Sequence, residues 1–336
     1  MKKRIVIFVA VIFLLGAAYV GKVFFSSQGY FQSSKKVVFI YYELTPEELM
    51  ETLVKDSILS DVSSFQTLIR LKNVKRFKSG RYEVSKGIRT NQLINKFRAG
   101  LQTPVLVKVD GVRDVYQLAG SLSKQMKSDS SEFINALLDA DLLKEHRLKQ
   151  EEAISLILPN NYELFWNLPP KKFVQRMIQV SEKYWTEENL NQAKKLNLSK
   201  SEVYTLASIV KGETVNKDEA PKIAGLYLNR LRIGMPLEAD PTITFALNLK
   251  KARVYFNDLV VNSPYNTYKI KGLPPGPIFM VEPVYLDAVL NAENHNFIFM
   301  CAQPKSTGYH NFSSNFAQHR LYAQQYRDWL NASNIQ

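Results

Sequence analysis

The stretch LASIVKGETV, residues 206–215, places a single carboxylate in register with an apolar helical face. Ser199 has the residue type of a helix N-cap, and Glu202, three positions later, completes the pattern of a capping box. In a helix that begins there, Glu213 follows three apolar residues at helical spacing: Leu206, Ile209 and Val210. The sequence therefore predicts a packed helix that carries one acid where a leucine would be expected.

The chemistry of Glu213 depends on whether it faces the core or the solvent. A carboxyl on an apolar face loses the hydration of its charged form, so its pKa rises from about 4.3 toward about 6 or above. Such a group is protonated near neutral pH and can donate a proton to a glycosidic oxygen. The alternative is that Glu213 lies in the last turn of the helix and is solvated.

The N-terminal segment has the pattern of a membrane anchor. Basic residues at positions 2–4 precede an uncharged apolar run over residues 5–21. The run is longer than the apolar region of a cleaved signal peptide, so we predict a retained transmembrane anchor and its flank over residues 1–25. Basic residues ahead of the run place the N-terminus on the cytoplasmic side and the remainder of the chain outside.

Composition narrows the remaining function classes. With 336 residues, 46% of them hydrophobic, the chain is long enough for one large or two ordinary domains. Cys301 is the single cysteine, which excludes an intramolecular disulfide. A net charge of +13 favours anionic neighbours such as a membrane surface, or is simply a solvated basic surface. Because the working part faces outward, we expect no nucleic acid partner.

A small subdomain is predicted directly after the anchor. Residues 26–36 are rich in Ser and Gln and have the composition of a flexible linker. Residues 37–104 follow with the order strand, helix, helix, strand. Thr45 is the expected cap of the first helix, with Pro46 at its first position.

Residues 105–336 are predicted to form a larger mixed α/β domain. A strand over residues 105–111 leads to helical patterns over residues 115–127 and 131–143. Two helices are expected from Ser199, followed by segments rich in turns. The predicted fold class is therefore α+β, with an N-terminal transmembrane helix, a small subdomain and a larger domain.

Three further segments carry polar side chains that are candidates for a functional site. NRLRIGMPLEADPT, residues 229–242, is expected to end a helix and continue as a loop with Glu238 and Asp240, although Asp240 is equally suited to cap a turn. In YNTYKIKGLPPGPI, residues 265–278, two tyrosines flank Asn-Thr, a combination that holds sugar rings or belongs to the core. GYHNFSSNFAQHR, residues 308–320, contains two histidines nine positions apart.

Cofactor signatures are absent from these segments. The two histidines lack the spacing of a metal site, and the sequence has no HExxH or clustered Cys and His pattern, so we predict no metal. Phosphate-loop and dinucleotide fingerprints and a GxSxG elbow are missing too, so no cofactor is predicted.

Taken in order, the motifs resemble the YceG-like family, the membrane-anchored endolytic murein transglycosylases of bacteria. The matches are ASIVxxET at 207–214, NRLxxGMxL at 229–237, DPT at 240–242, YNTY at 265–268 and GLPPGPI at 272–278. The unit over residues 37–104 is similar to the LysM-like subdomain of that family, including FKxGxY at 77–82. The resemblance implies a YceG-like catalytic domain over residues 105–336.

The resemblance also implies which residues act. The glutamate before the threonine of ASIVxxET is the catalytic acid of the family, which corresponds to Glu213. The sequence departs from the family at Lys211, where a second acid is common, and at Glu238, where glutamine is usual. Lys211 is expected about 160° around the helix from Glu213. The substrate-binding candidates are Asn229, Glu238, Asp240, Tyr265, Asn266, Thr267, Tyr268 and His310.

The implied reaction cleaves the MurNAc-β-1,4-GlcNAc bond of nascent peptidoglycan glycan strands. The muramyl 6-hydroxyl closes onto C1 without water, leaving 1,6-anhydroMurNAc ends and terminating strand elongation. The resemblance further implies an inner-membrane protein with a periplasmic catalytic domain and peptidoglycan synthases as partners. Two alternatives stay open: a catalytically silent, tethered peptidoglycan-binding protein, and a hydrolase that uses Glu238 or Asp240 as a second carboxylate.

Overall fold

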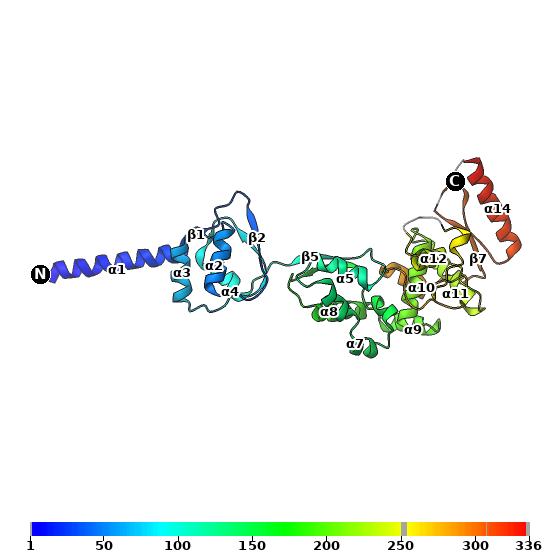
Figure 1. Ribbon diagram of the computed structural model, residues 1–336, viewed down its shortest axis with the longest axis horizontal. Helices are drawn as coiled ribbons and strands as arrows, with labels where there is room; N and C mark the ends of the chain where they lie inside the picture. Colours follow the sequence, from blue (N-terminus) through cyan, green and yellow to red (C-terminus); the bar gives the residue numbers. More distant parts are fainter. Residues whose placement is uncertain (1, 250–253, 307, 334–336) are drawn as a thin grey trace. The chain divides into compact units, whose positions relative to one another are not determined.

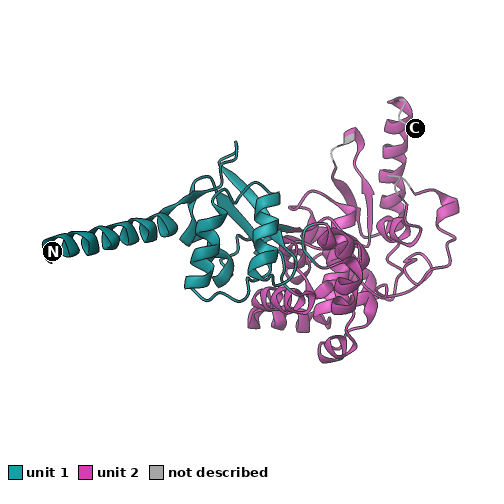
Figure 2. Ribbon diagram, turned by 60° about the vertical axis from the view of Figure 1, so that its left-hand side comes forward, with its two compact units in different colours: residues 1–107, 125–127, 162–168 teal, residues 108–124, 128–161, 169–336 magenta. Residues whose placement is uncertain are grey.

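The computed structural model describes residues 2–249, 254–306 and 308–333. The chain divides into two compact units, coloured separately in Figure 2. Unit 1 comprises residues 1–107, 125–127 and 162–168, and unit 2 comprises residues 108–124, 128–161 and 169–336. Strands β5 (Val105–Val109) and β6 (Asn160–Leu164) pair with each other, and the division between the units falls within both strands.

Helix α1 (Lys2–Phe25) opens unit 1 and carries the apolar run. Over Lys3–Phe25 its most apolar window has a mean hydropathy of 2.4 and none of that window is buried. Among the described residues, it is the one helix that is long and apolar enough to cross a membrane. A helix with these properties fits a membrane anchor.

The remainder of unit 1 has the predicted order of strand, helix, helix and strand. Strand β2 (Lys35–Ile40) pairs antiparallel with β3 (Gly80–Ser85), with Lys35 opposite Ser85 and Ile40 opposite Gly80. Between them lie α2 (Pro46–Lys55) and α3 (Val62–Leu71), and the two-residue strands β1 (Ser27–Gln28) and β4 (Ile88–Arg89) pair before α4 (Thr90–Ala99). Thr45 caps α2 as predicted, and Glu48 completes a capping box that the sequence analysis did not include.

The segment predicted as a flexible linker is partly built into unit 1. Gln28 is fully buried, and its amide nitrogen donates to the carbonyl of Asp61 and to the hydroxyl of Thr90. Its amide oxygen accepts hydrogen bonds from the backbone nitrogens of Ser60 and Asp61. One amide side chain thereby satisfies backbone groups in the turn before α3, a use that a Ser- and Gln-rich composition does not reveal.

Unit 2 is mainly helical, with one long hairpin near its end. Strands β7 (Phe299–Ala302) and β8 (His310–Ser313) pair antiparallel, with Ala302 opposite His310. The helices are α5 (Val115–Ser123), α6 (Ser130–Leu137), α7 (Ala140–Glu145), α8 (Pro170–Tyr184), α9 (Glu187–Lys195), α10 (Lys200–Glu213), α11 (Ala220–Arg232), α12 (Asp240–Ala246), α13 (Pro283–Leu290) and α14 (Phe316–Ala332), with 3₁₀ turns at Gln150–Leu156, Phe256–Asp258 and Pro304–Ser306.

Helix α10 is the central helix of unit 2. It begins at the Ser199 cap, where the predicted capping box with Glu202 is present. Residues 203–210 are all buried, because α11, α12 and α13 pack against the helix. Helices α11 and α12 are labelled beside α10 in Figure 1. The buried hydroxyl of Ser208 is satisfied by two hydrogen bonds: it donates to the Thr205 carbonyl and accepts from the backbone nitrogen of Ile278. Burial over residues 203–210 thus extends beyond the apolar face expected from the sequence and includes Thr205 and Ser208.

The structure adds elements that the sequence patterns did not indicate. The segment expected as a loop at Asp240 begins α12, because Pro241 suits a first helical turn. The helical pattern over residues 131–143 divides into α6 and α7 where Asp139 caps a new helix. The β7–β8 hairpin and α14 lie side by side in the segment expected to be rich in turns.

Candidate active site

The carboxyl of Glu213 is held at the C-terminal end of α10. Its Oε1 accepts a hydrogen bond of 2.7 Å from the hydroxyl of Tyr227, which projects from α11. Tyr227 is buried, and burial raises its pKa well above 10, so the phenol keeps its proton and acts as the donor. Two packed helices therefore fix the orientation of one carboxyl group.

The environment of Glu213 favours its protonated form. Burial raises the pKa of this carboxyl to about 7, and the nearby negative charge of Asp240 adds to the rise. The Tyr227 hydrogen bond and the charges of His310 and Arg230 act in the opposite direction without outweighing burial. Glu213 retains some solvent access, so the group is both protonated near neutral pH and reachable.

Gly212 allows α12 to approach the end of α10. A Cβ atom at Gly212 would lie 2.6 Å from Cβ of Pro241, closer than side-chain carbons pack. The missing side chain brings the first turn of α12 beside Glu213. Asp240 begins that turn, and its Oδ1 accepts a hydrogen bond of 2.6 Å from the hydroxyl of Tyr268.

Arg230 and Glu238 form an ion pair in the same region. The Nη1 atom of Arg230 lies 2.9 Å from Oε2 of Glu238 and also donates to the carbonyls of Pro236 and Leu237. Its Nε donates to the carbonyl of Ile298, just before β7. Four interactions hold this buried guanidinium, whereas the Glu238 side chain is 42% exposed. The cation is thus fixed, and Glu238 is the accessible partner.

His310 is oriented by a buried carboxylate. Its Nδ1 lies 2.9 Å from Oε2 of Glu219, and its backbone nitrogen donates to Oε1 at 2.7 Å. The Glu219 side chain is 6% exposed and stands at the start of α11. Both contacts orient the first residue of β8 relative to that helix.

One cavity of about 430 Å³, a volume in the range of small-ligand sites, is lined by Glu213, Tyr227, Arg230 and His310 among others. It lies within unit 2, between the ends of α10 and α11, the start of α12 and the β7–β8 hairpin with α14. Of the residues predicted for the site, the cavity includes Glu213, Glu238, Asp240, Tyr268 and His310.

Two other predicted residues, Asn229 and Asn266, have their amide groups occupied by contacts within the fold. Asn229 donates to the carbonyls of His295 and Phe297 and faces a different cavity of about 730 Å³. Asn266 is fully buried and donates to the carbonyls of Leu259 and Val261. Their amides connect loops, so the structure does not bring them to Glu213.

Thr267 and Tyr265 also lie outside this cavity. The buried hydroxyl of Thr267 accepts from the backbone nitrogen of Ala239 at 3.0 Å and lies 2.9 Å from the Thr242 hydroxyl. Thr267 therefore positions the segment that carries Asp240. The Tyr265 ring packs against Phe245, with centroids 4.7 Å apart, and lines a separate cavity of about 240 Å³.

Lys211 points away from the cavity, as its place on the helical wheel predicted. Its Nζ donates to the carbonyl of Met280 and lies 2.7 Å from Oε2 of Glu282, before α13. The cation therefore joins α10 to α13 instead of acting near Glu213.

Sequence patterns did not single out Tyr227, Arg230 or Glu219. Tyr227 sits within an apolar helical run, and Glu219 follows Asp218 in a charged segment. Their importance comes from contacts with residues 14 and 91 positions away, such as the Glu219–His310 pair. A signal was present only for Arg230, which lies within the NRL motif beside Asn229.

Fold and cavity together define a class: an α+β protein with an N-terminal apolar helix and one protonated carboxyl in the cavity of its larger unit. The chain belongs to the YceG-like family, which matches residues 38–325. It is 26% identical over 292 residues to an endolytic murein transglycosylase of Bacillus subtilis, covering 82% of this chain and 80% of that protein.

Further similarities agree with this family. An endolytic murein transglycosylase of Streptococcus pneumoniae is 25% identical over 281 residues, covering 74% of this chain and half of that longer protein. A crystal structure of a YceG-like protein from Listeria monocytogenes has the same fold, with a TM-score of 0.56 and 23% identity. That similarity covers 86% of this chain and 99% of the other.

Proposed function

We propose that this protein is a lytic transglycosylase that cleaves the MurNAc-β-1,4-GlcNAc bond of peptidoglycan and leaves 1,6-anhydroMurNAc ends. The observation that carries the proposal is the single carboxyl of Glu213, whose pKa burial raises to about 7 in a cavity open to substrate. Relatives named endolytic murein transglycosylase support this activity.

The first step is proton donation to the leaving oxygen. Oε1 of Glu213 accepts the Tyr227 hydrogen bond, so Oε2 is the oxygen that carries the proton. Donation from Oε2 to the glycosidic oxygen breaks the bond from that oxygen to C1 and leaves positive charge on the muramyl ring. The Asp240 carboxylate, held by Tyr268, stabilises this charge electrostatically.

The second step closes the anhydro ring. The ionised Glu213 takes the proton of the muramyl 6-hydroxyl as that oxygen bonds to C1, which returns the carboxyl to its starting form. The nucleophile belongs to the substrate, so the reaction needs no water and no second carboxylate as a base. One tuned acid therefore serves both steps.

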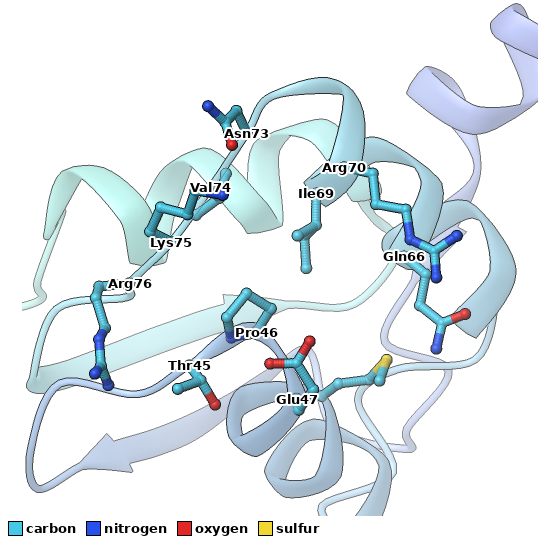
Figure 3. A pocket seen from close by; sticks show the side chains of 11 residues that line it. Thr45, Pro46, Glu47, Gln66, Ile69, Arg70, Asn73, Val74, Lys75 and Arg76 are labelled. Atoms are coloured by element: carbon cyan, nitrogen blue, oxygen red, sulfur yellow. The ribbon is translucent and has the colours of Figure 1, made fainter.

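Unit 1 is proposed to act as a LysM-like subdomain that grips glycan. A cavity of about 730 Å³ lies between the start of α2 and the end of α3 with the following loop. Figure 3 shows side chains of these two segments, such as Pro46 and Ile69, facing one another across it. Arg70 and Arg76 at its wall suit an acidic or strongly polar polymer.

The proposed location follows from α1. As a single-pass anchor with its N-terminus in the cytoplasm, α1 holds both units on the outer side of the bacterial inner membrane, where new glycan strands emerge. Cleavage there terminates strand elongation, and peptidoglycan synthases are the proposed neighbours. The basic residues at positions 2–4 support this orientation.

The test is mass spectrometry of muropeptides that the full-length protein, in detergent, releases from purified peptidoglycan. The matched sample is Glu213→Gln, which keeps an oxygen to accept the Tyr227 hydrogen bond but cannot donate a carboxyl proton. We expect anhydromuramyl ends from the wild type and none from the variant. Anhydro ends released equally by a folded Glu213→Gln protein would contradict the assigned role.

The product distinguishes a second candidate, a hydrolase. Asp240 lines the same cavity as Glu213, which is the observation that favours a two-carboxylate mechanism. Reducing ends in the released fragments would establish that mechanism. A folded wild-type protein that releases nothing would instead favour the glycan-binding protein without activity.

A further inference from the structure

Three aromatic side chains gather on one wall of the Glu213 cavity. Phe299 belongs to β7, while Phe316 and His319 belong to the first turn of α14. The Phe299 and His319 rings are stacked, with centroids 5.2 Å apart and planes 22° apart, and the Phe316 centroid lies 5.8 Å from that of Phe299. We call these three residues the aromatic wall. All of them line the cavity.

The position of Phe316 is not explained by the core of unit 2. Helix α14 contains no buried residue among its described side chains, and the Phe316 side chain is 60% exposed. An exposed phenylalanine gains little stability for the fold, because most of its apolar surface stays in water. Its place at the mouth of a cavity is what a ligand-binding aromatic side chain requires.

The aromatic wall is uncharged near neutral pH. Burial lowers the pKa of His319, and the positive charges of Arg230 and Arg327 lower it further against the opposing negative charge of Glu238. The Nδ1 atom of His319 is buried without a hydrogen-bond partner, which also disfavours a charged ring. Its neutral imidazole therefore adds a flat face beside Phe299.

A fixed cation connects the aromatic wall to the acid. The guanidinium of Arg230 lies over the Phe299 ring, 5.6 Å from its centroid. The positive charge of the same guanidinium lowers the pKa of Glu213. The aromatic wall and Glu213 line the same cavity, so a ligand stacked on the wall lies in the cavity that contains the acid.

We propose that Phe299, Phe316 and His319 form a stacking subsite for one pyranose ring of the glycan strand, next to the bond that Glu213 cleaves. The C–H groups on one face of a pyranose carry partial positive charge and pack against the negative face of an aromatic ring. The polar substituents at the edge of the sugar then remain free for the charged groups of the cavity. The inference of this subsite rests on the proposed function and specifies where the protein holds one sugar of the glycan substrate.

The test measures binding in the full-length Glu213→Gln protein, in which cleavage is blocked. The probe is glycan strands freed of their peptides, titrated in detergent by calorimetry. We expect Phe316→Ala and His319→Ala, each in that background, to weaken binding by about tenfold, the range of one aromatic stacking contact. Phe316→Trp is expected to retain binding, because it keeps a flat face.

Leu321→Ala is the matched control. Leu321 is a 59% exposed apolar residue of the same helix and does not line the cavity, so its loss should leave affinity unchanged. Thermal melting of each variant shows that the fold persists. Binding by both alanine variants within twofold of the parent would overturn the subsite, as would the absence of saturable binding by the Glu213→Gln parent.

Different experimental results would contradict the subsite and the proposed function. Wild-type protein that releases anhydro ends, together with alanine variants that bind glycan normally, would overturn the subsite alone. Wild-type protein that releases no fragments, together with variants that lose glycan binding, would overturn the activity and keep the subsite.

Discussion

The hydroxyl of Tyr227 lies 2.7 Å from Oε1 of Glu213 and joins α11 to the last residue of α10. The bond favours the ionised carboxylate, so it lowers the pKa of Glu213 against the larger effect of burial. The balance of these effects places the pKa of Glu213 at about 7, so the acid is half protonated near neutral pH and mostly protonated below it. Tyr227 is therefore a positioning residue that also lowers the pH at which Glu213 loses its proton.

The Tyr227→Phe variant should be active to a higher pH. Without the hydroxyl, burial is less opposed and the pKa of Glu213 rises, by about one unit for one charge-assisted hydrogen bond. The general acid must be protonated, so the alkaline limb of the kcat/KM profile should move upward, while kcat falls because the carboxyl is less well oriented. The measurement is the pH dependence of muropeptide release.

Tyr285→Phe is a suitable control for that variant. Tyr285 is also buried, and its hydroxyl donates to the carbonyl of Thr214 instead of to the acid. The alkaline limb of the kcat/KM profile of Tyr285→Phe should stay at the wild-type pH. An unchanged limb in Tyr227→Phe would show that the hydrogen bond does not influence the proton of Glu213.

Glu213→Gln should stabilise unit 2 at alkaline pH. The folded pKa of about 7 exceeds the usual 4.5, so between these values the unfolded chain has released a proton that the folded chain retains. The stabilising contribution of protonated Glu213 to the free energy of unfolding is therefore fully present below about pH 4.5 and is lost as pH rises through about 7. Glutamine has no such pH dependence, so the stability of the variant relative to the wild type should rise by about 3 kcal/mol between pH 4 and pH 8.

Urea unfolding of both proteins at several pH values checks this prediction. The relevant quantity is the difference between the two free energies of unfolding, because all other titrating groups are shared. A difference that stays constant from pH 5 to pH 8 would mean that the Glu213 carboxyl titrates normally in the folded protein.

Gly212→Ala should reduce both stability and activity. The added methyl group overlaps Pro241, so the start of α12 must move away and take Asp240 with it. Overpacking of this kind costs about 1 to 3 kcal/mol, and displacement of a cavity residue should lower kcat by roughly tenfold. Thermal melting and product release measure the two effects.

Gly120→Ala provides the contrast within another helix. Nothing lies within 4 Å of a Cβ atom at Gly120 in α5, so alanine should stabilise that helix by up to about 1 kcal/mol. Equal effects of the two substitutions would show that the close approach of α10 and α12 is unimportant.

Gln28→Ala should destabilise unit 1. The substitution removes both hydrogen-bonding ends of a buried amide and leaves backbone nitrogens at Ser60 and Asp61 without their partner. The expected cost is about 2 to 4 kcal/mol, measured by amide exchange of those two residues and by melting. Gln32→Ala, at an exposed position, is the control and should change neither the amide exchange nor the melting temperature. Unchanged amide exchange of Ser60 and Asp61 in Gln28→Ala would support a flexible linker instead.

Local patterns made part of this structure predictable. The capping boxes at Thr45 and Ser199 involve residues three positions apart, so their geometry follows from the sequence alone. The placement of Glu213 within an apolar helix was also visible, because helical spacing repeats regularly. These signals defined the candidate acid and the helix that carries it.

Long-range contacts explain what the sequence did not reveal. The partner of Glu213 is a tyrosine on another helix, and Thr267 supports a loop 28 residues away through Ala239. The composition of residues 26–36 predicted a flexible linker, because the burial of one amide side chain, Gln28, does not change the polar composition of the segment. Such roles depend on how elements pack, which residue types and spacing do not determine.

The place of Glu213 at the very end of α10 restricts how this protein can change during evolution. Each residue added to a helix lengthens it by 1.5 Å and turns everything beyond it by about 100°. An insertion or deletion between the Ser199 cap and Glu213 would therefore rotate the acid away from Tyr227, however conservative the inserted residue. Lineages of this protein should vary in the length of their loops while keeping the number of residues from that cap to the acid unchanged.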